Sequence, residues 1–149
     1  MINEQEIYIV MKNFIGGVEF AGNNIPWHLE GKVNLLVQGV RTDPKDIDIA
    51  TTIEGYAIFK SMLDKGSYFK FVEEGIVTSW HGYHYITYEA NGILVDIAYY
   101  EDPTFAMMDK TRTIQWEGLQ LPVTPLPDAK KFYKMVGKPD MARSIEKYL

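Results

Sequence analysis

Residues 40–52 read VRTDPKDIDIATT, with aspartates and isoleucines alternating at their centre. This alternation is the strongest structural signal in the chain. Asp46 and Asp48 alternate with Ile47 and Ile49. Successive side chains of a strand point to opposite faces, so a strand here buries both isoleucines and presents both aspartates on the other face. Two carboxylates this close repel each other and raise each other's proton affinity. The pair is therefore either a solvated strand face or a site that holds a cation.

The segment before this strand, WHLEGKVNLLVQG (residues 27–39), predicts a short strand, a glycine and a helix of about two turns. Gly31 allows the backbone to approach a ligand closely, and a helix N-terminus presents free N–H groups that suit a phosphate. Gly39 follows the last helical residue. Taken alone, the same pattern also fits an ordinary tight turn.

A third carboxylate lies downstream in GILVDIAYY (residues 92–100), where Asp96 interrupts an apolar strand. Ionised groups are rarely buried unless they are paired or bind a metal, so Asp96 is a metal ligand, a salt-bridge partner or part of an exposed face. Asn91-Gly92 predicts a two-residue hairpin turn, which places Asp96 opposite Thr87. A longer loop would shift this register.

Together the three aspartates predict a metal site. Asp46 and Asp48 on one strand and Asp96 on a neighbouring strand would gather oxygen ligands on one surface, as Mg²⁺ bound to phosphates requires.

The remaining pattern predicts one α+β domain over residues 1–149, with strands interleaved with helices. Asn3 and Glu6 form a capping pair for an amphipathic helix that we expect to stop at Gly16-Gly17. Further segments follow along the chain: a turn with a short strand at 23–31, a helix at 52–66, strands over 68–100, a short hairpin or strand at 113–123 and closing helices at 126–137 and 138–149. In the 52–66 helix, the expected apolar side consists of Ile53, Tyr56, Ala57, Phe59 and Leu63.

Composition narrows the function classes. The chain has 149 residues and no cysteine, which excludes disulfides, cysteine-bound zinc and a thiol nucleophile. The start lacks the features of a signal peptide and no apolar run approaches ~20 residues, so we expect a cytoplasmic protein without a membrane segment. The net charge of −5 disfavours broad nucleic-acid binding.

The charge is unevenly distributed. Residues 128–149 hold six Lys/Arg and three acidic residues, a net of +3, which leaves −8 for the rest of the chain. Basic side chains such as Lys131 and Lys134 could face an anion held by the acidic body, or they could be solvated helix lysines.

Other motifs are weaker. His81 and His84 are three residues apart and would point to opposite faces of a strand, so they cannot share a metal. For His28 we expect a core or hydrogen-bonding role. Trp80 and the many tyrosines could stack a base or pack the sheet.

The order of these motifs resembles the polymerase-β-type nucleotidyltransferase superfamily. That order is a glycine turn, a short helix, the Asp-Ile-Asp-Ile strand and a later single aspartate. Residues 27–52 are most similar to its small stand-alone branch, which includes aminoglycoside nucleotidyltransferases and abortive-infection-type toxins. Thirteen residues, Val33 to Lys45, separate Lys32 from Asp46, and Arg41 stands just ahead of the aspartate pair. The resemblance covers about residues 25–149 and implies a nucleotidyltransferase-like, mixed and mainly antiparallel sheet with helices packed on it.

The resemblance also implies roles for these residues. Asp46 and Asp48 would bind Mg²⁺, or Mn²⁺ in its place. Asp96 would complete the metal site or act as base toward the acceptor. Gly31 would approach the triphosphate. Lys32 stands where glycine or serine is usual, and it would either bind a phosphate or fill the pocket.

The implied activity is transfer of a nucleoside monophosphate from an NTP to a hydroxyl, with release of pyrophosphate. Arg41, Lys131 and Lys134 would help to bind the nucleotide. The acceptor, a small molecule, a protein or an RNA end, stays open, and a partner subunit could contribute its binding surface. The alternative is a catalytically silent nucleotide- or partner-binding module, such as a toxin–antitoxin component, and Lys32 is the feature that favours it.

Overall fold

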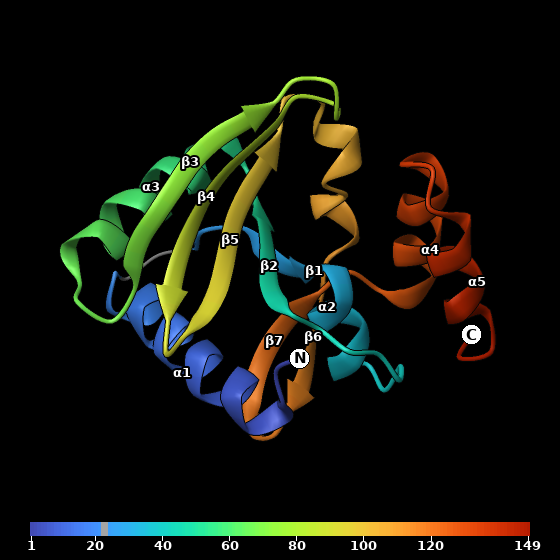
Figure 1. Cartoon of the computed structure of the whole chain (residues 1–149), viewed down its shortest axis with the longest axis horizontal. Coiled ribbons are helices and arrows are strands. Elements are labelled where there is room, and N and C mark those ends of the chain that lie inside the picture. Colours follow the sequence, from blue (N-terminus) through green and yellow to red (C-terminus); the bar gives the residue numbers. More distant parts are fainter. Residues whose placement is uncertain (22–23) are drawn as a thin grey trace.

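A seven-stranded mixed sheet forms the centre of the molecule in the computed structural model, which describes residues 1–21 and 24–149 (Figure 1). The strands are β1 (Trp27–Glu30), β2 (Asp46–Thr51), β3 (Lys70–Val77), β4 (Tyr83–Ala90), β5 (Ile93–Tyr100), β6 (Arg112–Trp116) and β7 (Leu119–Val123). Their order across the sheet is β3-β4-β5-β2-β1-β7-β6. The pairs β2–β5 and β1–β7 are parallel, and the other pairs are antiparallel. The predicted mixed, mainly antiparallel sheet is confirmed.

Five α-helices and two short 3₁₀ turns complete the described chain. They are α1 (Glu4–Phe20), α2 (Gly31–Val37), α3 (Ile53–Lys65), η1 (Pro103–Phe105), η2 (Met108–Lys110), α4 (Leu126–Met135) and α5 (Pro139–Glu146). None of the helices in residues 1–21 and 24–149 combines the length and hydropathy that a bilayer crossing requires.

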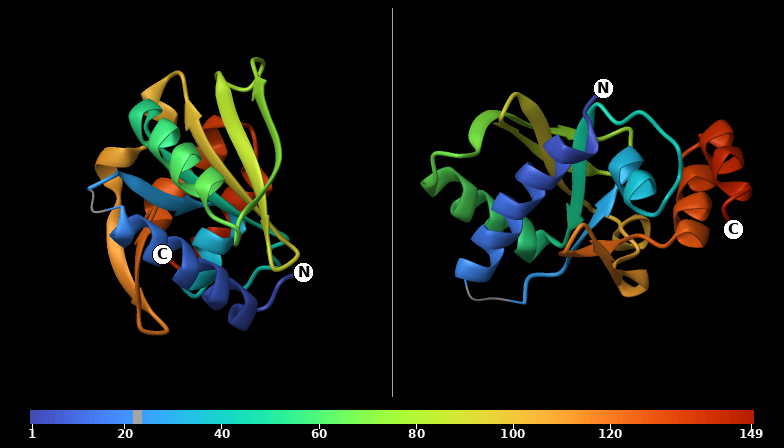
Figure 2. Two further views of the ribbon diagram at one scale, coloured as in Figure 1. Left: turned by 90° about the vertical axis from the view of Figure 1, so that its left-hand side faces the viewer. Right: turned by 90° about the horizontal axis from the view of Figure 1, so that it is seen from below.

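The helices α1 and α3 cover one face of the sheet and enclose the main core. Phe14 of α1 packs on Phe59 of α3, and both are fully buried with Ile47, Ile49 and Ile97 of the central strands. The α4–α5 pair lies beyond the other side of the sheet, at the end that also holds α2 (Figures 1 and 2). A second apolar cluster joins this pair to the α2 region. The face of β2 and β5 that carries the aspartates is thus the face away from α1 and α3.

Helix α1 is longer than predicted. The Asn3–Glu6 capping box is confirmed, since each residue's backbone N–H donates to the other's side chain at 2.8–3.0 Å. The expected stop at Gly16-Gly17 is wrong, because the helix continues to Phe20. A methyl group at Gly17 would lie 3.5 Å from the end of the Met62 side chain. Gly17 therefore packs against α3, which offsets its poor helix propensity, whereas a methyl group at Gly16 would meet, apart from the helix backbone around it, no atom of the described residues within 4 Å.

The buried side of α3 also differs in part from the prediction. Phe59 and Leu63 are buried, but Ile53 and Ala57 are exposed. The buried stripe runs through Gly55, Phe59 and Leu63 at four-residue spacing, because Gly55 faces the side chains of Thr51 and Ile25 where a larger residue would clash.

The turn predicted at Asn91-Gly92 forms, and residues 113–123 lie in the hairpin of β6 and β7. Asn91 and Gly92 have φ values of 53° and 76°, which the two-residue turn between β4 and β5 requires. Thr87 pairs with Asp96, so the predicted register is confirmed. The predicted turn at 23–31 includes Asn23, which lies outside the described residues; the strand that follows it is present as β1.

Candidate active site

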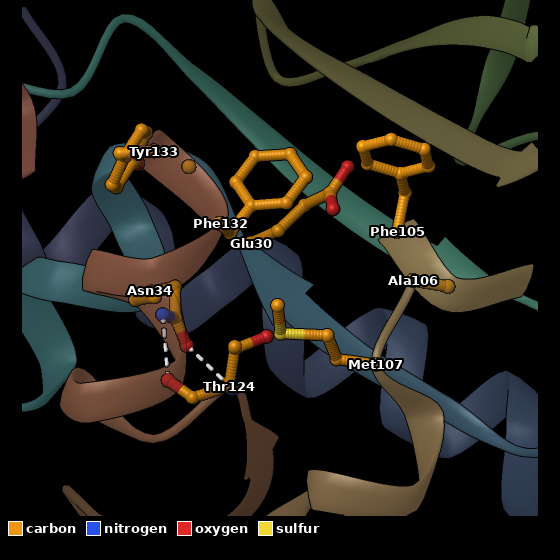
Figure 3. A pocket seen from close by; sticks show the side chains of 10 residues that line it. Glu30, Asn34, Phe105, Ala106, Met107, Thr124, Phe132 and Tyr133 are labelled. Atoms are coloured by element: carbon orange, nitrogen blue, oxygen red, sulfur yellow. Dashed lines mark hydrogen bonds between the residues drawn. The ribbon is translucent and has the colours of Figure 1, made fainter. Parts of the chain in front are cut away.

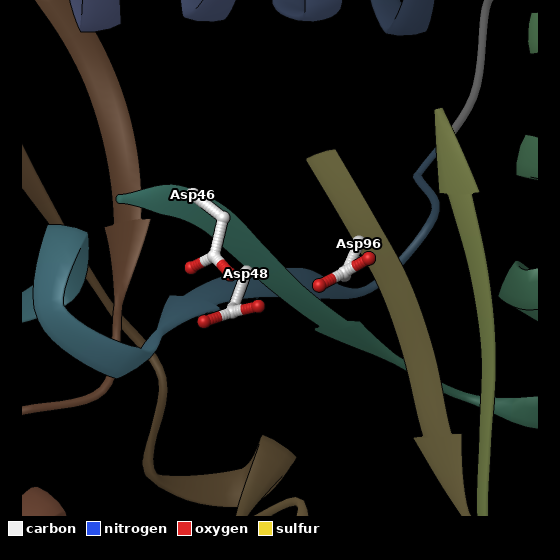
Figure 4. Close-up of side chains that lie close together, drawn as sticks. All are labelled: Asp46, Asp48 and Asp96. Atoms are coloured by element: carbon white, nitrogen blue, oxygen red, sulfur yellow. The ribbon is translucent and has the colours of Figure 1, made fainter. Parts of the chain in front are cut away.

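Three aspartates converge on the sheet face that the helices α1 and α3 leave open. Asp46 and Asp48 come from β2 and Asp96 from the adjacent strand β5, and all three side chains point to one side (Figure 4). One carboxylate oxygen from each lies within 4.8 Å of the other two. The parallel register places Asp48 beside Asp96. Burial of Ile47 and Ile49 on the opposite face fixes this orientation.

A fourth carboxylate extends this cluster. Glu30 at the end of β1 pairs with Asp48, so Glu30, Asp48 and Asp96 form a row across three strands, and Thr87 continues it on β4. Burial, and then the charge of Asp96, raise the pKa of Glu30 to about 7, and the charge of Lys138 acts against both. Sequence reasoning missed Glu30, because its place in the row depends on the antiparallel pairing of β1 with β2.

Asp48 and Asp96 hold their protons more tightly than free carboxyls do. Burial, and then the charges of Asp46, Glu30 and Asp96, raise the pKa of Asp48 well above its ordinary value. Burial also raises the pKa of Asp96, and a hydrogen bond from the Thr87 hydroxyl, 2.5 Å long, works against that rise. Such mutual repulsion is what a divalent cation would relieve, so the cluster has the charge and the oxygen donors that Mg²⁺ or Mn²⁺ prefers.

Gly31 begins α2 directly against the cluster. Its φ is 69°, and a side chain at this position would collide with the Asp48 carboxylate. Glycine is therefore required at this position for two reasons: the backbone conformation has a positive φ, and a side chain would occupy the space of the Asp48 carboxylate.

Lys32, the next residue, extends from the start of α2 toward the 40–45 loop. Its Nζ lies 3.2 Å from Asp43 Oδ1, and its side chain is 41% exposed. The same hydrogen bond lowers the pKa of Asp43. An ion pair this exposed contributes little to stability, so Lys32 is free to exchange Asp43 for another anion.

A cavity of about 320 Å³ joins these groups to an aromatic region. Its lining consists of Glu30, Gly31, Lys32, Lys45, Asp46, Asp48, Trp80, Tyr83, Tyr100, Phe132, Tyr133, Lys138 and Met141. We call the part lined by the carboxylates, Lys32 and Lys45 the polar end, and the part lined by Trp80, Tyr83, Tyr100 and Phe132 the aromatic end. This volume falls in the range of small-ligand sites. A second hollow, of about 10 Å³, lies beside Glu30 and beneath Phe132 (Figure 3). It has room for about one water molecule.

The structure brings some of the predicted nucleotide-binding residues to this cavity and leaves others outside it. Gly31 and Lys32 line it. Arg41 is exposed and its backbone N–H donates to the Tyr148 hydroxyl, while Lys131 and Lys134 are exposed on α4; none of these three lines the cavity. Two other lysines, Lys45 and Lys138, line the cavity instead, and neither was among the predicted nucleotide-binding residues. Of these, Lys138 was already visible as part of the basic C-terminal segment.

The histidines have structural partners. His28 is buried with Nδ1 2.6 Å from the Thr111 hydroxyl, which confirms its expected core and hydrogen-bonding role. His84 contacts Glu101 at 2.7 Å, and His81 stacks on Phe105, so the two do not share a ligand site.

Comparison with known proteins places this fold in a class. No protein-family model and no curated protein matches the chain. Among solved structures, the fold is that of the nucleotidyltransferases, as the sequence resemblance implies. A Thermotoga maritima protein provisionally assigned as a nucleotidyltransferase superposes with a TM-score of 0.72 at 20% identity, over 99% of this chain and 94% of that one.

The antibiotic-resistance factor ANT(2'')-Ia is a second structural neighbour. Its solution structure has a TM-score of 0.64 at 11% identity, over 96% of this chain and 84% of that one. Its crystal structure with adenylyl-2''-tobramycin has a TM-score of 0.58 at 12% identity, over 93% and 91%. Identities this low establish the fold, so the activity has to be inferred from the site.

Proposed function

We propose that this protein transfers a nucleoside monophosphate from an NTP to a hydroxyl acceptor and releases pyrophosphate. The observation that supports it best is the cluster of Asp46, Asp48 and Asp96 at the border of a cavity that also holds Lys32 and Lys45. Asp46 and Asp48 would hold Mg²⁺ or Mn²⁺, with Asp96 beside them. The bound cation neutralises phosphate charge and lowers the barrier to displacement.

The protein's own groups can carry the remaining chemistry. In the reaction the acceptor oxygen bonds to the α-phosphorus, the bond from that phosphorus to the bridging oxygen breaks, and the pyrophosphate leaves. Asp96 would accept the hydroxyl proton, a role that its raised pKa favours. The Thr87 hydroxyl, by donating to Asp96 Oδ1, would keep the other carboxylate oxygen directed at the acceptor.

The lysines would hold the triphosphate. Lys32 and Lys45 border the cavity beside the aspartates, where an ammonium can bind a phosphate oxygen. Gly31 would let the backbone approach the same phosphates. We propose that Arg41, Lys131 and Lys134, which lie outside the lining, act at longer range by attracting the anionic nucleotide.

For the acceptor we propose a small-molecule hydroxyl as the first class to test, because ANT(2'')-Ia, which shares the fold, was solved with an adenylylated tobramycin. A protein hydroxyl, an RNA end, or a surface completed by a partner subunit are the other classes. We place the reaction in the cytoplasm, where NTPs and Mg²⁺ are available.

The test is incubation of the purified protein with each α-labelled NTP, Mg²⁺ and a cell extract, followed by identification of the labelled product and measurement of pyrophosphate. We expect label transfer that Asp46→Asn and Asp48→Asn abolish. NTP binding without any turnover in the wild type would instead favour the catalytically silent module.

A further inference from the structure

The aromatic end of the 320 Å³ cavity is built from rings of three separate chain segments. Trp80 follows β3, Tyr83 and Tyr100 are paired across β4 and β5, and Phe132 comes from α4. The Trp80 and Tyr83 ring centroids are 4.7 Å apart, and those of Tyr100 and Phe132 are 6.1 Å apart. These rings lie on the aspartate side of the sheet, opposite the main core.

Tyr100 is the buried centre of this group. Its side chain is 3% exposed, yet it belongs to neither hydrophobic cluster of the described residues. Within residues 1–21 and 24–149, its hydroxyl has no hydrogen-bond partner. Buried hydroxyls are nearly always paired, and an orphan at a cavity wall indicates that a partner is expected there.

Lys138 adds a second donor at the same end. Its Nζ lies 5.6 Å from the Trp80 ring centroid, and its side chain lines the cavity. An ammonium has only N–H donors, and a tyrosine hydroxyl is protonated near neutral pH. The Lys138 ammonium can only donate and the Tyr100 hydroxyl can donate, so these two groups, among rings that meet edge-on, suit a flat ligand that carries a carbonyl oxygen.

We propose that this aromatic end binds the nucleobase of the NTP, and that Tyr100 and Lys138 select guanine and uracil, which carry a carbonyl oxygen at the ring position where adenine and cytosine carry an exocyclic amino group. The inference rests on the proposed function, which places the triphosphate at the polar end. A base inserted beside Trp80 and Phe132 stacks on both rings and gives the Tyr100 hydroxyl its partner. The exocyclic amino group of adenine or cytosine would instead face the Lys138 ammonium.

The experiment is titration calorimetry in Mg²⁺ with non-hydrolysable analogues of the four NTPs and with inorganic tripolyphosphate. For the wild type we expect at least tenfold tighter binding of the guanosine and uridine analogues than of the other two. Tyr100→Phe should reduce that preference several-fold, and Trp80→Ala should weaken all four analogues. Both variants should bind tripolyphosphate as the wild type does, because it needs only the polar end.

A matched control is Tyr99→Phe, which removes the same hydroxyl from the next residue, on the opposite face of β5, where Tyr99 stacks on His84. It should leave every affinity unchanged. If the wild type binds all four analogues equally, or if Tyr100→Phe and Trp80→Ala bind them as the wild type does, the proposed base site is wrong. Binding of tripolyphosphate in that case would still support the phosphate site. A wild type that binds neither tripolyphosphate nor any analogue overturns the proposed function and this inference with it.

Discussion

Asp48 is the carboxylate whose pKa is raised by burial and by the charges of the other three carboxylates of the site. Asp46, Glu30 and Asp96 all raise its pKa, so near neutral pH the four carboxylates repel one another without a cation. The cluster therefore costs stability in the free protein, and a bound cation would offset the repulsion.

Replacing the Asp48 carboxylate separates the cost of charge repulsion from the gain of metal binding. We expect Asp48→Asn to raise the melting temperature in EDTA by a few degrees, about 1 kcal/mol, because the repulsion is relieved. The same variant should lose the upward shift that Mg²⁺ gives the wild type. Differential scanning calorimetry with and without Mg²⁺ measures both. Asp109→Asn, an exposed change beyond the site, should behave as the wild type. If Asp48→Asn keeps the full Mg²⁺ shift, the carboxylates do not form a metal site.

Lys32 decides whether the polar end is open to a nucleotide. Because its bond to Asp43 is exposed and exchangeable, we expect Lys32→Ser to leave stability almost unchanged. Loss of a charge-assisted hydrogen bond to phosphate should weaken binding of a non-hydrolysable NTP by about 1.5–3 kcal/mol, as measured by calorimetry. Lys12→Ser on α1 is the control. Tighter binding in Lys32→Ser would mean that the lysine blocks the pocket, and the enzyme assignment would then be withdrawn.

For single residues, the sequence predicted those site residues that stand out from their neighbours in the chain. Asp46, Asp48 and Asp96 stand out because isoleucines and other apolar residues flank them. Glu30 and Tyr100 give no such local signal, because their roles arise from strand pairing and from the docking of α4 over the cavity.

Among the elements, α2 is the one whose start shapes the site. Gly31 and Gly39 both have positive φ, at 69° and 91°, but only Gly31 contacts a site residue. Alanine at either position should cost about 1–2 kcal/mol for the backbone alone. Gly31→Ala should also displace the Asp48 carboxylate.

The pair Gly31→Ala and Gly39→Ala therefore distinguishes backbone strain from the loss of space at Asp48. We expect chemical denaturation to show Gly31→Ala as the less stable variant, and only Gly31→Ala to lose Mg²⁺-dependent NTP binding. Equal behaviour of the two variants would show that the close approach to Asp48 has no functional consequence.

Helix α4 allows a test of long-range attraction of the nucleotide, because its residues Lys131 and Lys134 are exposed and lie outside the cavity lining. If they attract the nucleotide at long range, Lys131→Ala and Lys134→Ala should each weaken NTP binding about two- to fivefold at low salt. The effect should vanish as added salt shortens the screening length below about 8 Å. A loss of affinity that persists at high salt would indicate direct contact with the nucleotide.

Element boundaries followed the sequence wherever a local signal sets them, as at the Asn3 cap and the Asn91-Gly92 turn. They departed from it where packing between elements dominates. Helix α1 continues through Gly16-Gly17, where Gly17 packs against Met62 of α3, and Ile53 is exposed because Gly55 lies on the side of α3 that faces the sheet.

At the scale of the whole molecule, His28 links stability to pH. Burial lowers its pKa from 6.5 to about 4, so the folded protein keeps it neutral. The stability that depends on neutral His28 is fully present above pH 6.5 and is lost as the pH falls toward 4, because the unfolded chain takes up the proton first. The loss amounts to about 3 kcal/mol.

The raised pKa values of Glu30, Asp48 and Asp96 change stability in the opposite direction, so the wild type alone does not isolate His28. We therefore predict the difference in unfolding free energy between the wild type and His28→Asn, measured by denaturant titration. This difference should decrease by about 3 kcal/mol between pH 7.5 and pH 4. A difference that is constant over this range would show that His28 titrates alike in both states.

The parallel pairing of β2 with β5 also sets the order in which the molecule can form. The hairpins β3–β4, β4–β5 and β6–β7 close over short turns, whereas β2 reaches β5 only after a long loop has closed. The aspartate cluster therefore does not exist until this late step. If these contacts form after the rate-limiting barrier, we expect a cation bound there to slow unfolding and to leave the rate of folding almost unchanged.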